Sequence, residues 1–142
     1  MKRLRRLGRA EWLLLAEALA TLALSSAAIR LLPFRKVAAM AGKDGKAAAA
    51  PDASAQIVRV RWAVDAWARR VPWRTVCFQR GLTAHLMLRR RGYGSRLHYG
   101  VAQSPEEGLS AHVWVTLEGR DVTGGDEAEK FARVATFPSP KA

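Results

Sequence analysis

The sequence has only one cysteine, Cys77, among its 142 residues. A single thiol excludes an internal disulfide and a zinc site built from several cysteines. It also favours an intracellular protein, which we place in the cytoplasm. We expect no metal and no cofactor.

Acidic residues are also scarce. The chain has 24 Lys and Arg against 12 Asp and Glu, a formal net charge of +12 at pH 7. This balance indicates an anionic partner, and an acidic peptide would fit it as well as a nucleic acid. The arginines are spread through helical segments, and no aromatic–basic motif of an RNA-binding sheet is present. We therefore expect no nucleic-acid partner.

The first nine positions are strongly basic, and a largely apolar run follows at 12–29. This order resembles a signal peptide or a membrane span. However, Glu17, Thr21 and Ser25 recur every four residues as a polar stripe, and an acidic residue is costly in lipid. We predict that residues 1–41 form an amphipathic helical segment that packs on the domain or on a partner, and is neither cleaved nor inserted. Peripheral contact with an anionic membrane surface stays open.

Residues 42–55 are rich in Ala and Gly with one Pro and predict a linker. Beyond it, 57–71 repeats apolar side chains at three- and four-residue steps, the pattern of a core helix. Residues 56–138 are predicted to form the main domain.

The most informative segment is 72–92, in which Cys77 stands at the predicted start of a helix. Pro72 interrupts the preceding structure, Thr75 is a candidate N-cap, and Gly92 ends the helix. A thiol in the first turn lies at the positive end of the helix dipole, which favours the nucleophilic thiolate. The alternative is that Cys77 is a small buried apolar residue.

After Gly92 the apolar pattern changes to a period of two, which predicts strands at 97–101 and 111–117. Glu118-Gly119 predicts a two-residue hairpin turn to a strand at 120–123, and 131–137 predicts one more strand. The fold class is therefore α+β, with a helical N-terminal half and the Cys77 helix packed on a small antiparallel sheet.

The three histidines are candidate bases for Cys77. His85 is eight residues along the same helix, roughly 12 Å away, and is too far. His98 is a candidate base or a surface residue on the first strand. His112 begins the second strand, where it can face the start of the Cys77 helix. Sequence spacing alone gives His112 only a slight preference over His98 as the base for Cys77.

The acid that would orient His112 is harder to assign. Pairing the hairpin from its turn places Thr116 opposite Asp121 and His112 opposite Gly125. Asp121 then lies roughly 13 Å from His112, whereas Asp126 reaches the imidazole if the strand bends at the two glycines. We favour Asp126; orientation of the ring by a backbone carbonyl stays open.

Three stretches carry a resemblance to a known family. They are the Cys77 segment from Val-Pro-Trp-Arg-Thr-Val-Cys to Leu-Arg-Arg-Arg-Gly92, the strand Leu-His-Tyr-Gly-Val101, and Ala-His-Val-Trp-Val115. Together they resemble the transglutaminase-like proteins of lasso-peptide biosynthesis, over about residues 57–137. Val113 stands where that family usually has alanine, and Gly124 stands about where it has its acid.

The resemblance implies a transglutaminase-like core and a papain-like cysteine protease that removes the leader peptide of a ribosomally made precursor. It implies a Cys–His–Asp triad with Cys77 as nucleophile and His112 as base, and Asp126 is our choice for the third member. A leader-binding protein would deliver the precursor, and an ATP-dependent cyclase would act afterwards.

Two other functions stay open. A basic non-enzymatic module that binds nucleic acid or a membrane surface would leave Cys77 merely buried. Acyl transfer to an amine would use the same Cys–His pair through the same thioester. Gln79 and Trp73 are additional candidates for the site, Trp73 as a wall of the cleft.

Overall fold

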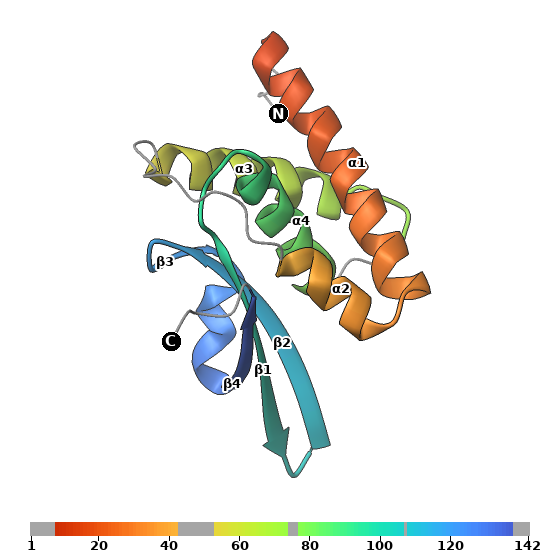
Figure 1. Cartoon of the computed structure of the whole chain (residues 1–142), viewed down its shortest axis with the longest axis vertical. Coiled ribbons are helices and arrows are strands. Elements are labelled where there is room, and N and C mark those ends of the chain that lie inside the picture. The colour runs from red at the N-terminus through yellow and green to blue at the C-terminus, as the bar shows by residue number, and fades with distance from the viewer. Residues whose placement is uncertain (1–7, 43–52, 74–76, 107, 138–142) are drawn as a thin grey trace.

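The structure is a computed structural model, and it describes residues 8–42, 53–73, 77–106 and 108–137. Figure 1 shows helices gathered on one side of a small twisted sheet. The described helices are α1 (Arg9–Leu31), α2 (Phe34–Ala41), α3 (Ala53–Ala68) and α4 (Cys77–Arg90). Most of the predicted linker, like Thr75, lies outside the described residues.

The sheet is antiparallel, and within the described residues it has four strands in the order β3-β2-β1-β4. The strands are β1 (Arg96–Ser104), β2 (Gly108–Leu117), β3 (Arg120–Thr123) and β4 (Ala132–Phe137). A short 3₁₀ helix, η1 (Gly125–Lys130), carries the chain from β3 at one edge to β4 at the other. The predicted α+β class, with a helical N-terminal half on a small antiparallel sheet, is confirmed.

The ends of α4 follow from local backbone chemistry. At its C-terminus Gly92 has a φ of 87°, its N–H donates to the Arg89 carbonyl, and the Tyr93 N–H donates to the Leu88 carbonyl. This pair of bonds closes the helix in a left-handed turn that glycine adopts without steric cost. The predicted end of the helix at Gly92 is therefore confirmed.

The polar stripe of α1 lies against α4. Glu17 accepts hydrogen bonds from Arg90 and Arg91, and Thr21 accepts one from Arg90 at 2.9 Å. Burial raises the pKa of Glu17, but the hydrogen bonds and charges of Arg91 and Arg90 outweigh it, and the net pKa lies below its usual range. Across the fold, Trp67 on α3 donates from its indole N–H to the Leu15 carbonyl on α1 at 2.8 Å.

By length and composition α1 is also apolar enough to cross a membrane, with a mean hydropathy of 1.7 over its most apolar stretch. Thirty-nine per cent of that stretch is buried in the protein. A core helix of a soluble protein or a signal sequence meets the same criterion, so this property alone does not place α1 in lipid.

The core lies between the helices and one face of the sheet, where Leu97, Val113 and Val115 are buried. Gly81 is the point of closest approach. A Cβ added there would lie 2.8 Å from Cγ1 of Val113 and 3.6 Å from Leu97 and Val115. The absence of a side chain at Gly81 therefore sets how closely the Cys77 helix sits on β2.

The hairpin register is partly as predicted. Leu117 pairs with Arg120 and Thr116 with Asp121, and positive φ values at Glu118 and Gly119 make the expected tight turn. A bulge then shifts the register, so that Val115 pairs with Thr123. The bulge leaves Val122 without a partner on β2. The predicted pairing of His112 with Gly125 was wrong, because β3 contains this extra residue and ends before it reaches His112.

Candidate functional site

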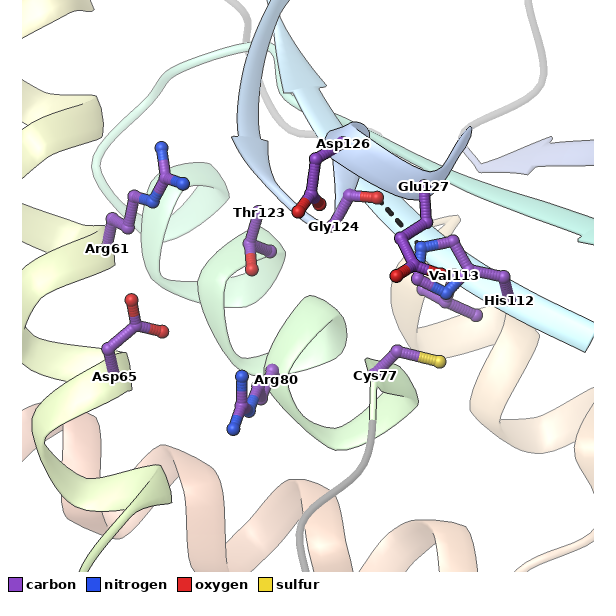
Figure 2. A pocket seen from close by; sticks show the side chains of 10 residues that line it. All are labelled: Arg61, Asp65, Cys77, Arg80, His112, Val113, Thr123, Gly124, Asp126 and Glu127. Carbon is purple, nitrogen blue, oxygen red and sulfur yellow. Dashed lines mark hydrogen bonds between the residues drawn. The ribbon is translucent and has the colours of Figure 1, made fainter. Parts of the chain in front are cut away.

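One open cavity of about 300 Å³ lies where the start of α4, the middle of β2 and the chain after β3 meet α3 (Figure 2). Its lining contains the sequence-predicted residues Cys77, His112 and Asp126 together. The other lining residues are Arg61, Asp65, Arg80, Val113, Thr123, Gly124 and Glu127.

Cys77 is the first residue of α4, as the sequence predicted. Its thiol is free and partly buried, and it borders the cavity. The first backbone N–H groups of a helix have no partner within the helix, so their positive ends point at this region.

His112 borders the same cavity from β2. Its Nε2 lies 2.8 Å from the carbonyl oxygen of Gly124. A carbonyl only accepts hydrogen bonds, so Nε2 donates and the neutral ring keeps a lone pair on Nδ1. This is the tautomer that can take a proton from a thiol. Within the described residues no hydrogen bond joins His112 to Cys77, and such contacts are often loose without substrate.

A compact turn holds the Gly124 carbonyl in place. Gly124 has a φ of 80°, and a Cβ there would lie 2.8 Å from the Val113 carbonyl oxygen. The next residue, Gly125, donates its N–H to the Asp121 carboxylate at 2.8 Å. Asp121 therefore contacts the turn that supports His112, and not His112 itself. A carbonyl that orients the ring was one alternative left open by the sequence.

Asp126, the favoured third member of the triad, lines the cavity two residues after Gly124. Among the described residues it makes no hydrogen bond to His112, whose Nε2 is bonded to Gly124. Asp126 is exposed to solvent. Its catalytic role stays a prediction.

Aromatic rings fix the plane of the His112 imidazole. It stacks on Phe131, with ring centroids 5.1 Å apart, and on Trp114 at 5.8 Å. Beyond it, Trp114 stacks on His98. Gly100 lies beneath this layer, where an added Cβ would be 3.0 Å from the Trp114 ring. The stack restricts rotation of the imidazole away from the cavity.

The two other histidines lie outside the cavity. His98 is buried, with Nδ1 3.1 Å from Thr136 Oγ1 and Nε2 2.9 Å from Thr116 Oγ1. Its interpretation as a surface residue was wrong, because β4 covers the edge of β1. Burial, with the charges of Arg133 and Arg96, lowers the pKa of His98 to about 4.

His85 is fully buried in α4, where Nε2 contacts the Ala41 carbonyl and Nδ1 contacts Ser95 Oγ, both at 2.8 Å. Burial lowers the pKa of His85 to about 4. Both ring nitrogens of His85 contact groups within the core, so His85 is a structural histidine. Of the three histidines only His112 lines the cavity.

Three further charged residues, which the sequence did not single out, also line the cavity. Arg80 lies one turn after Cys77 on α4, and its buried Nε has no hydrogen-bond partner among the described residues. Arg61 and Asp65 come from α3. The spacing of Arg80 from Cys77 could have revealed it, since i and i+3 share a helix face. No local signal points to the two α3 residues.

The remaining candidates lie elsewhere. The Trp73 indole N–H donates to Ser26 on α1 at 3.0 Å, and Trp73 is absent from the cavity lining. Gln79, on the first turn of α4, is also absent from it, and its carbonyl accepts a hydrogen bond from Thr83.

Comparison with known proteins assigns the chain to a superfamily. The profile of one family, described as the transglutaminase-like superfamily, matches residues 18–136, and the chain belongs to that superfamily. Neither the curated proteins nor the solved structures gave a significant match. Membership indicates cysteine-protease or acyl-transfer chemistry, the two activities that a Cys–His pair supports.

Proposed function

We propose that this protein is a cysteine peptidase that removes the leader from a ribosomally made lasso-peptide precursor. The observation that carries the proposal is that the Cys77 thiol and a His112 ring with Nε2 bonded to Gly124 border the same cavity. The resemblance around these residues to the proteases of lasso-peptide biosynthesis supplies the substrate class.

The proposed reaction starts with transfer of the thiol proton from Cys77 to Nδ1 of His112. The sulfur attacks the carbonyl carbon of the scissile peptide bond, and the oxyanion is stabilised by backbone N–H groups at the start of α4. The C–N bond then breaks, and the imidazolium gives its proton to the leaving amine. Water, deprotonated by His112, hydrolyses the remaining thioester and releases the leader as an acid.

The other cavity residues have supporting roles in this proposal. The Gly124 carbonyl holds His112 in the required tautomer, and the Asp126 carboxylate stabilises the imidazolium through its charge. Arg80 and Arg61 give the cavity cationic groups that can bind carbonyl or carboxylate oxygens of a peptide.

The proposed partners are the precursor peptide, a small leader-binding protein that delivers it, and a lasso cyclase that acts on the product, all in the cytoplasm. The test is to incubate the purified protein with candidate precursors, with and without a leader-binding protein, and to identify the products by mass spectrometry. Cleavage between leader and core that is lost in Cys77→Ala and His112→Ala supports the proposal. Cleavage that survives in Cys77→Ala contradicts it.

Acyl transfer is the second candidate, because an amine can attack the same thioester in place of water. The open cavity gives an incoming amine the same access as water. Adding a primary amine such as methylamine to the cleavage assay separates the two. An amide of the leader as the main product would favour transfer, whereas the free acid would favour hydrolysis.

A further inference from the structure

The side of α1 that faces away from the protein has no exposed polar residue between Arg9 and Arg30. We call this surface the outer face of α1. Its residues are Trp12, Leu13, Ala16, Ala20, Ala23, Leu24, Ala27 and Leu31. With 3.6 residues per turn they fall within about one third of the circumference of the helix, so they form one continuous strip roughly 29 Å long.

The large side chains on this strip are well exposed. Trp12, Leu13, Leu24 and Leu31 are 59%, 65%, 56% and 76% exposed. Leu32 and Phe34 extend the strip towards α2 and are also exposed. Soluble monomeric proteins rarely leave so continuous an apolar surface in water, and such surfaces commonly mark an interaction site.

Positive charge flanks the strip at both ends. Exposed cations are Arg9 and Arg30 on α1 and Arg35 and Lys36 on α2. Both acidic residues of α1 are engaged: Glu11 accepts a hydrogen bond from the Gly8 N–H, and Glu17 pairs with Arg90 and Arg91. In the sequence, four further Lys and Arg residues stand within the six positions before Leu7.

We propose that the outer face of α1 docks on an anionic lipid bilayer, with the helix axis parallel to the membrane surface. Its leucines and Trp12 enter the boundary between headgroups and acyl chains, and the flanking cations bind lipid phosphates. The helix does not span the bilayer, because its opposite side stays bonded to the protein through Glu17 and Thr21.

The charges favour this surface over a second copy of the chain. Two α1 helices packed through their outer faces would bring Arg9 close to Arg9 or to Arg30, whichever way they run, and these cations repel. Four exposed acidic residues, Glu118, Asp126, Glu127 and Glu129, lie on the β2–β3 hairpin and η1, which are away from α1 (Figure 1), and Glu106 lies in the β1–β2 turn. Neither α1 nor α2 has an exposed acidic residue, whereas both have exposed cations, so this side attracts an anionic surface.

Docking in this way leaves the catalytic cavity open. Among the described residues, its lining comes from α3, α4, β2, β3 and the chain that follows β3, and none of it comes from α1. The protein can therefore be held at a membrane surface while a peptide enters the cavity. This inference does not depend on the proposed peptidase function.

The test uses the whole chain and vesicles of phosphatidylcholine, with or without phosphatidylglycerol, in a flotation assay. The wild-type protein should float with the phosphatidylglycerol vesicles, and added salt should weaken the binding. Leu24→Glu should reduce partitioning by about tenfold or more, because it removes a leucine that the bilayer would bury and places a charge in the apolar boundary. The matched control is Leu109→Glu, at a 70% exposed position on β2 far from the strip.

Three results would overturn the proposal. One is that the wild-type protein does not float with anionic vesicles. Another is that Leu24→Glu binds the vesicles as well as the wild type does, or that Leu24→Glu and the control Leu109→Glu lose binding equally. The third is self-association in sedimentation that Leu24→Glu abolishes while vesicle binding is absent, since this would assign the strip to a second copy. Circular dichroism and the alkylation rate of Cys77 confirm that the variants remain folded.

Discussion

The contact between Gly81 and Val113 should control both stability and activity. In Gly81→Ala the new Cβ would lie 2.8 Å from Cγ1 of Val113, about 0.7 Å inside an ordinary carbon–carbon contact of ~3.5 Å. Gly81 follows Cys77 by one helical turn, and Val113 follows His112 directly. Relief of the clash therefore moves the thiol relative to the imidazole.

The free energies can be estimated for each variant. Overpacking of this kind costs about 1–3 kcal/mol, and alanine in a helix recovers about 1 kcal/mol relative to glycine. Val113→Ala alone should cost about 2 kcal/mol through lost burial and a cavity. In the double variant the clash is gone, because Val113 no longer has its Cγ1. The double variant should therefore be about 2 kcal/mol more stable than the summed free-energy losses of the two single variants predict.

Urea unfolding of the four proteins measures this coupling, and the alkylation rate of Cys77 reports on the site. The double variant should regain most of the peptidase activity that Gly81→Ala loses. Additive free energies, with a coupling below about 0.5 kcal/mol, would show that α4 and β2 do not meet through these two residues.

Three more predictions concern Asp121, Asp126 and the buried His85. Asp121→Ala should lower the cleavage rate by about tenfold or more by freeing the turn at Gly124, whereas Asp121→Asn, which keeps the oxygen that binds Gly125, should stay near wild type. Asp126→Asn should lower kcat at unchanged KM. A wild-type rate for Asp126→Asn would mean that the protein works with a Cys–His dyad. The pKa of His85 lies near 4 in the fold against about 6.5 unfolded, so its contribution of about 3 kcal/mol is full above pH 6.5 and declines towards pH 4. His85→Gln should make urea stability fall less steeply between these pH values, while His98, whose pKa is also about 4, keeps part of the slope. An unchanged slope would contradict the assignment.

The parts of the fold that local chemistry determines were predictable from the sequence. The Cys77 helix and its end at Gly92 follow from apolar spacing and from the left-handed glycine turn. The turn at Glu118-Gly119 follows in the same way. In these segments the signal and the structure involve neighbouring residues, so no knowledge of tertiary packing was required.

What failed depends on contacts between distant segments. The bulge in β3 shifts the register after Thr116, and its sequence does not distinguish a bulged strand from a regular one. His98 is buried because β4 pairs with β1, and strand order cannot be deduced from alternation alone. The partner of the His112 ring is a backbone carbonyl, and every residue has one, so no residue type marks it.

The central claim is that Cys77 forms a thioester with the leader. The most direct measurement is the intact mass of the protein after a brief reaction with precursor and an acid quench. The account predicts an adduct with the mass of the leader acyl group on Cys77, which hydroxylamine releases and which is absent in Cys77→Ala. Cleavage of the precursor by Cys77→Ala, at any rate near that of the wild type, would contradict it.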